Sequence, residues 1–194
     1  MTVTTRVFVL RAIKYSEADL VIHALNKQGE KLNFIAKSAL KSKKRFGGGV
    51  LEPLNYIEIS YKENKDLDKL HILNEAKIID DFSGLRTEYE RLELGLYFLQ
   101  VIDKVSFSGD QHSPDSFNLL GHALKQAQTT TKLNLLRCLF ELKLLQYQGV
   151  LYDQDQYKEL LCHPITNCNN IEIDNSSIHR VQRQVHQLLK EWLN

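Results

Sequence analysis

The chain is poor in the residues and runs that mark several protein classes. Its 194 residues include only three cysteines, three prolines and one tryptophan. No apolar run approaches the length of a membrane-spanning helix, and residues 1–15 mix Arg, Lys and Thr among the aliphatic side chains. We therefore expect a cytoplasmic protein without membrane contact, in which the cysteines are reduced thiols.

Sequence signatures of catalysis and of metal binding are also missing. There is no Gly-x-Ser-x-Gly, no His-Glu-x-x-His and no Asp-rich metal motif. Three glycines end at Gly49, but Val50 follows them rather than the Lys and Ser or Thr of a phosphate-binding loop. Cys162 and Cys168 lie too far apart for a zinc knuckle and have no second pair. We expect no enzymatic activity, no cofactor and no metal.

Charge is distributed unevenly, although the net charge is only +1. Residues 1–50 carry ten basic and three acidic side chains, whereas residues 51–110 carry seven basic and thirteen acidic ones. Residues 111–194 are balanced, with eight of each. A basic first quarter followed by an acidic stretch is typical of a protein that contacts a polyanion with one face.

A short basic segment that ends in glycines is the strongest candidate for a binding function. Lys41 to Arg45 holds four cations, Phe46 follows, and the next three residues are glycines with unusual backbone freedom. We expect a mobile loop between two strands that follows the phosphates of a nucleic acid. Phe46 either stacks on a base or anchors the loop in the core, and the sequence leaves both open. The other candidates for base stacking are Tyr15, Phe34, Tyr56 and Tyr61.

Alternation of apolar and polar residues predicts strands at 3–15, 20–25, 31–38, 56–61 and 70–79, with turns around Gly29 and over residues 64–68. Five short strands indicate a small closed barrel of the oligonucleotide/oligosaccharide-binding (OB) type. From residue 84, helical spacing predicts helices over 84–101, from Pro114 to Leu124, over 133–147, and after Ser176 or Ser177, with Ser83 capping the first. The sequence thus predicts an α+β chain: an all-β OB-fold barrel over residues 1–80, then an all-α helical domain over residues 81–194.

A series of short motifs resembles one known family. The motifs are Arg11–Asp19, Ile35–Ala39, Arg45–Gly47, Leu51–Leu54 and Leu85–Tyr97. Together they resemble the RecO family of DNA repair and recombination mediators over about the first 150 residues. The resemblance implies a non-enzymatic protein that binds single- and double-stranded DNA, anneals complementary strands and assists recombinase loading. It also implies RecR and single-stranded-DNA-binding protein as partners, and a nucleoid-associated location.

The chain departs from the family pattern in two places. Where members often have Lys-Gly-Ala-Arg, this chain has Lys37-Ser38-Ala39-Leu40 followed by Lys41. Many members also carry a four-cysteine zinc ribbon after the apolar helix. In this chain that region is shortened, and because of this departure we expect no zinc. By position, the resemblance implies DNA-binding residues at Arg11, Lys14, Lys37, Lys41, Lys43, Lys44 and Arg45, and Phe46 joins the predicted site as the aromatic of the same segment.

Two other functions remain open from the sequence. The first is a protein–protein adaptor of a repair complex, for which the acidic stretch 63–93 would contact a basic partner and nucleic acid contact would be incidental. The second is a barrel that binds RNA rather than DNA.

Overall fold

The structure is a computed structural model, which describes residues 2–64, 70–106, 114–151 and 154–193. The chain forms two compact units, and both are discontinuous in sequence. The first contains Met1–Phe82 and Leu99–Phe117, and the second contains Ser83–Phe98 and Asn118–Asn194. The sequence predicted two contiguous domains, 1–80 and 81–194. The structure differs from this prediction because residues 99–117 belong to the first unit.

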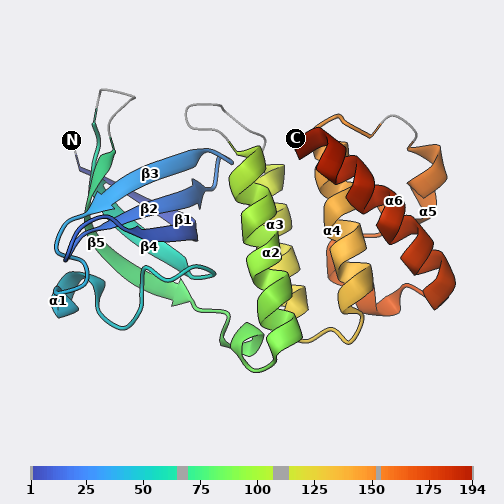
Figure 1. The fold of residues 1–194 in the computed structure, drawn as a ribbon, viewed down its shortest axis with the longest axis horizontal. Helices are drawn as coiled ribbons and strands as arrows, with labels where there is room; N and C mark the ends of the chain where they lie inside the picture. Colours follow the sequence, from blue (N-terminus) through green and yellow to red (C-terminus); the bar gives the residue numbers. More distant parts are fainter. Residues whose placement is uncertain (1, 65–69, 107–113, 152–153, 194) are drawn as a thin grey trace. The chain divides into compact units, whose positions relative to one another are not determined.

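Five strands dominate the first unit (Figure 1). They are β1 (Thr2–Lys14), β2 (Leu20–Asn26), β3 (Lys31–Ala36), β4 (Tyr56–Lys62) and β5 (His71–Asp80), with the short helix α1 (Lys43–Phe46) between β3 and β4. The strands close into a barrel in the order β1-β2-β3-β5-β4. The β3–β5 pair is parallel and the other pairs are antiparallel.

The long strand β1 makes this closure possible. Its first half, Thr2–Phe8, pairs with β4, and its second half, Val7–Lys14, pairs with β2. The register shifts between Val9 and Arg11, and such an irregularity allows a strand to bend. One strand therefore belongs to both sides of the barrel.

The barrel is filled by the inward-facing residues of every strand. Phe34 is fully buried, and its ring centroid lies 5.0 Å from that of Tyr61. Burial raises the pKa of Tyr61, and the nearby carboxylates of Glu63 and Glu30 add to this effect. The alternation that predicted the strands thus comes from a single apolar interior.

The second unit is helical. The elements that follow β5 in the chain are α-helices and short 3₁₀ helices: η1 (Ser83–Arg86), α2 (Tyr89–Val105), α3 (Asp115–Ala127), α4 (Leu133–Tyr147), η2 (Asp155–Tyr157), α5 (Lys158–Leu161), η3 (Ile165–Asn170) and α6 (Asn175–Leu193). The centre is α4, in which every residue from Leu135 to Leu145 except Arg137 is buried, and α4 packs against α6. No helix among the described residues is long and apolar enough to cross a membrane.

The structure confirms a β-sheet domain followed by a helical region, an α+β arrangement. The prediction that the second part is all-α is wrong in detail, because 3₁₀ turns and irregular segments separate its helices. Ser83 begins the 3₁₀ turn η1 rather than capping α2. The last helix is capped by Asp174, whose Oδ1 accepts a hydrogen bond from the backbone N–H of Ser177 at 2.9 Å. Most of the turn predicted at 64–68 lies outside the described residues.

Candidate nucleic-acid interface

Two connecting segments meet at one end of the barrel. The first is Lys14–Asp19, which runs from the last residue of β1 to the start of β2, and the second is Lys37–Gly49, which follows β3. The backbone N–H of Ser38 donates to Asp19 Oδ1 at 2.7 Å, and that of Leu40 donates to the carbonyl of Ala18 at 3.0 Å. We call these two segments the basic end. Its hydrogen bonds bring together residues that are about twenty positions apart in sequence.

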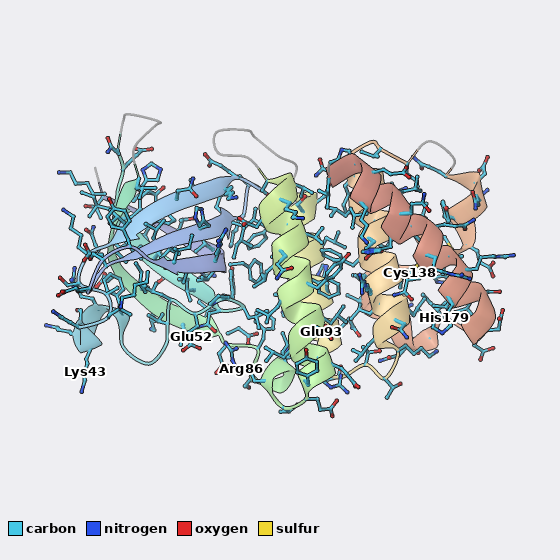
Figure 2. The ribbon with its side chains drawn as sticks, in the orientation of Figure 1. Lys43, Glu52, Arg86, Glu93, Cys138 and His179 are labelled. Carbon is cyan, nitrogen blue, oxygen red and sulfur yellow. The ribbon has the colours of Figure 1, made fainter. Side chains whose placement is uncertain are left out.

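Six of the predicted cations belong to the basic end, and all six are exposed: Lys14, Lys37, Lys41, Lys43, Lys44 and Arg45. Arg45 connects two parts of the group, because its Nη2 donates to the carbonyl of Lys37 at 2.9 Å and its Nε to Ser42 Oγ at 3.2 Å. Lys43 projects outward from α1 (Figure 2). The cations are therefore presented to solvent on an ordered backbone.

The predicted mobile loop is in part a helix. Residues 43–46 form α1, and of the three glycines after it Gly48 and Gly49 have positive φ angles. Phe46 is 6 % exposed and belongs to the barrel core. This burial supports the interpretation of Phe46 as an anchor of the segment, and contact of its ring with a base stays a prediction.

Two of the other four stacking candidates are also core residues. Phe34 is fully buried and Tyr61 is 7 % exposed. Tyr56 is half-buried, with its ring centroid 4.8 Å from that of Phe8. Tyr15 differs from these three, because it lies in the basic end and is 71 % exposed. Tyr15 is therefore the aromatic of this set whose ring remains accessible for stacking.

A second surface adjoins the basic end, and the sequence did not reveal it. The register places the exposed Arg11 opposite His23 and places His23 opposite Asn33, and His23 Nδ1 lies 2.6 Å from Asn33 Oδ1. The next outward-facing row consists of the half-buried side chains of Ile13, Val21 and Ile35. The period-2 alternation indicated which residues of each strand face outward. Only the register of the three strands shows which of these residues are neighbours on one surface.

Some cations of the basic first quarter are neutralised elsewhere. Arg6 Nε lies 3.2 Å from Glu58 Oε2, on the strand pair β1–β4. Lys31 Nζ lies 2.6 Å from Asp103 Oδ1 and donates to the carbonyl of the same residue at 2.9 Å. The charge count of the sequence therefore overstates what this region offers to a polyanion.

Carboxylates also occur within and beside the basic end. Asp19 serves as an acceptor for the backbone of Ser38, so its role is structural. Glu17 is exposed in the same turn, and Glu52 is exposed just after the glycines. The exposed cations outnumber these acidic groups two to one, since six cations face three carboxylates.

Nothing in the described part of the chain forms a metal centre, since no three His, Cys, Asp or Glu side chains gather there. All three cysteines are free thiols, of which Cys162 is exposed. Burial raises the pKa of Cys138 to about 12, with a smaller contribution from Glu141. Burial also raises the pKa of Cys168, so neither buried thiol is a ready nucleophile at neutral pH.

Comparison with known proteins assigns both parts of the chain. Residues 1–82 match the family model described as "Recombination protein O N terminal", and residues 86–157 match "Recombination protein O C terminal". The DNA repair protein RecO of Alkaliphilus metalliredigens is 33 % identical over 153 residues, which are 77 % of this chain and 59 % of that protein. The protein of the same name from Desulfatibacillum aliphaticivorans is 30 % identical over 159 residues, covering 79 % of this chain and 59 % of the relative.

The chain belongs to the RecO family, since the two models of that family match most of its length. A third relative, from Christiangramia forsetii, is 25 % identical over 150 residues and is likewise named DNA repair protein RecO. The chain spans about three-fifths of the length of these curated relatives.

Proposed function

We propose that this protein is a non-enzymatic DNA-binding mediator of repair and recombination. Its barrel, which we interpret as an OB-fold, would bind single- and double-stranded DNA at the basic end and along the adjoining β1–β2–β3 face. The strand order and the parallel β3–β5 pair support this interpretation. The observation that carries the proposal is the group of six exposed cations that hydrogen bonds hold at one end of the barrel.

Such a surface supports strand annealing without any covalent step. Two DNA strands repel each other through their phosphates, and a row of cations between them reduces this repulsion. Contacts to phosphates carry no sequence information, so the protein would accept any complementary pair. Base pairing then supplies the free energy that joins the strands. Assistance in recombinase loading would follow from the same ability to hold a strand.

The test is a salt titration of single-strand binding by the Lys43→Ala/Lys44→Ala variant. Both side chains are exposed on α1, and Arg45 keeps its structural hydrogen bonds. We expect weaker binding and a slope of log K against log salt that is smaller by about 1.4, since each phosphate that is no longer neutralised on a single strand lowers the slope by about 0.7. Fluorescence anisotropy with a labelled oligonucleotide measures both quantities.

The matched control is Lys62→Ala/Lys77→Ala, which removes the same charge from exposed positions on β4 and β5. Lys62 pairs in register with Thr2, whereas the basic end lies at the opposite end of β1, at Lys14. We expect this control to change the slope much less. Equal slopes for the two double variants would contradict the proposal, because the net charge alone would then explain binding.

We also propose RecR and single-stranded-DNA-binding protein as partners, on the strength of the family. A groove of about 610 Å³ in the helical unit supports a protein-binding role, which is also what the adaptor alternative requires. Residues of both charge signs line it, including Glu90, Glu93, Lys132 and Arg137.

A competition assay with matched DNA and RNA oligonucleotides separates DNA binding from the RNA alternative. Partner capture from nuclease-treated lysate, combined with no DNA affinity at physiological salt, would favour the adaptor.

A further inference from the structure

A pocket opens within the basic end, beside the cations. Its volume is about 380 Å³, within the range of small-ligand pockets. Apolar side chains from the strands and from the segment after β3 line it: Ala12, Leu20, Ala39, Phe46 and Leu51. Leu40, which is 54 % exposed, forms part of its rim together with Lys43. The pocket therefore combines an apolar interior with a cationic border.

Glycines form another part of the border. A Cβ at Gly47 would lie 2.2 Å from the carbonyl oxygen of Lys43, so no side chain fits at that position. Gly48 and Gly49 have φ angles of +67° and +71°, which other residues rarely adopt. Bare backbone thus borders the pocket on this side, and a flat ligand group can approach it closely.

We propose that this pocket holds one unpaired base of a bound single strand. This inference rests on the DNA-binding function proposed above and names the form of DNA that the site prefers. The charges fix the orientation of the nucleotide, because Lys43 at the rim attracts the phosphate. Glu52, which also lines the pocket, repels phosphate and accepts hydrogen bonds from base N–H groups. The base therefore enters and the phosphate stays outside.

The consequence is a preference that a purely electrostatic surface would lack. A paired base is stacked within its duplex and cannot enter a pocket without being extruded, which costs free energy. A backbone without bases offers the same phosphates but nothing to bury against the apolar lining. Single strands with bases should therefore bind more tightly than duplexes or abasic strands of equal charge.

The experiment compares oligo-dC with an abasic oligomer of the same length by fluorescence anisotropy, for three variants and the wild-type protein. Leu40→Ala removes an exposed part of the rim while leaving the backbone bond to Ala18 intact, and should weaken oligo-dC binding about fivefold or more without affecting the abasic strand. Lys44→Ala, an exposed cation that is not a lining residue, should weaken both ligands equally. Leu40→Lys adds a cation and should strengthen abasic binding while lowering the ratio of the two affinities.

Two results would overturn the proposal, and they are distinguishable. If the wild-type protein binds neither oligomer, the proposed DNA-binding function fails, and the pocket inference fails with it. If it binds both but Leu40→Ala leaves the ratio of affinities unchanged, only the base pocket is wrong. Circular dichroism of each variant confirms that the comparison is made between folded proteins.

Discussion

The barrel unit and the helical unit use charged side chains in opposite ways. In the barrel unit, six cations of the basic end are exposed on an ordered backbone. In the helical unit, α4 buries charge: the side chain of Glu141 is fully buried, and Lys143 is 7 % exposed. An exposed charge remains available to a ligand, whereas a buried charge needs internal partners to offset its lost hydration. The comparison separates charges that are available to a ligand from charges that support the fold.

The partners of Glu141 come from three helices. Tyr97 of α2 donates its hydroxyl hydrogen to Glu141 Oε1, Arg137 Nε lies 3.0 Å from the same oxygen, and His186 Nδ1 of α6 lies 3.3 Å from it. Arg137 also lies over the Tyr97 ring at 4.1 Å. Burial and then Glu141 raise the pKa of Tyr97. Burial opposes the charge of Arg137, but Glu141 and Tyr97 outweigh it and raise the pKa of Arg137.

The largest expected effect is the loss of this buried carboxylate. Glu141→Ala leaves the partly buried Arg137 and the Tyr97 hydroxyl without their shared acceptor. We expect the free energy of unfolding of the helical unit to fall by about 4 kcal/mol, as when one member of a buried ion pair is removed. Urea denaturation followed by circular dichroism measures it.

Two variants sharpen the interpretation of that result. Glu141→Gln keeps an acceptor oxygen and should recover part of the loss. Glu191→Ala, at an exposed position on α6, should change the free energy of unfolding by no more than about 0.5 kcal/mol. If Glu141→Ala lowered the free energy of unfolding by no more than Glu191→Ala does, burial of this charge would not be what distinguishes the two units.

A somewhat smaller effect is expected for Phe46→Ala in the barrel unit. Phe46 is 6 % exposed in the barrel core, and its truncation should lower the free energy of unfolding by about 3 kcal/mol. Tyr15→Ala, at an aromatic that is 71 % exposed, is the matched control and should cost about 0.5 kcal/mol or less. Thermal denaturation of both variants tests this. Unaltered stability together with lost single-strand affinity in Phe46→Ala would favour the stacking interpretation over the anchor interpretation.

The last effect is negligible at neutral pH and develops only under alkaline conditions. The pKa of Cys138 rises from an ordinary value of 9.0 to about 12 in the folded chain, so folding favours the protonated thiol. Between pH 9 and pH 12 the unfolded chain releases this proton while the folded chain retains it. Stability therefore falls as pH rises through this window, by about 1.4 kcal/mol per pH unit from this group.

The measurement is the free energy of unfolding at several pH values above about 8, for the wild-type protein and for Cys138→Ala. The variant should show a shallower fall, and the remaining slope includes contributions from Cys168, Tyr61 and Tyr97, whose pKa values are also raised. Parallel curves for the two proteins would contradict the assignment. The comparison uses slopes, so a constant stability cost of the substitution does not affect it.

The sequence predicted the elements that contain a strong periodic pattern. Alternation located all five strands to within two residues at each end, and the apolar run Leu133–Tyr147 coincides with α4. The short helix α1 escaped prediction, because four residues are too few to show a 3.6-residue period. The short elements η2, α5 and η3 escaped for the same reason.

The candidate site was predicted by composition but not by geometry. The run from Lys41 to Arg45 signalled cations, and their exposure agrees with that signal. The inward direction of Phe46 and the pairing of Arg6 with Glu58 depend on contacts across the barrel. No local pattern encodes such contacts, so the number of accessible cations could not be read from the sequence.

The carboxylate of Asp19 shows how a surface rich in exposed cations depends on an anion of its own. Its bond to the Ser38 N–H fixes where the segment after β3 leaves the barrel. An attempt to strengthen the proposed DNA binding by deleting every nearby negative charge would remove this hydrogen bond as well. The net charge would increase, but the two segments that carry the lysines would lose a hydrogen bond that keeps them side by side.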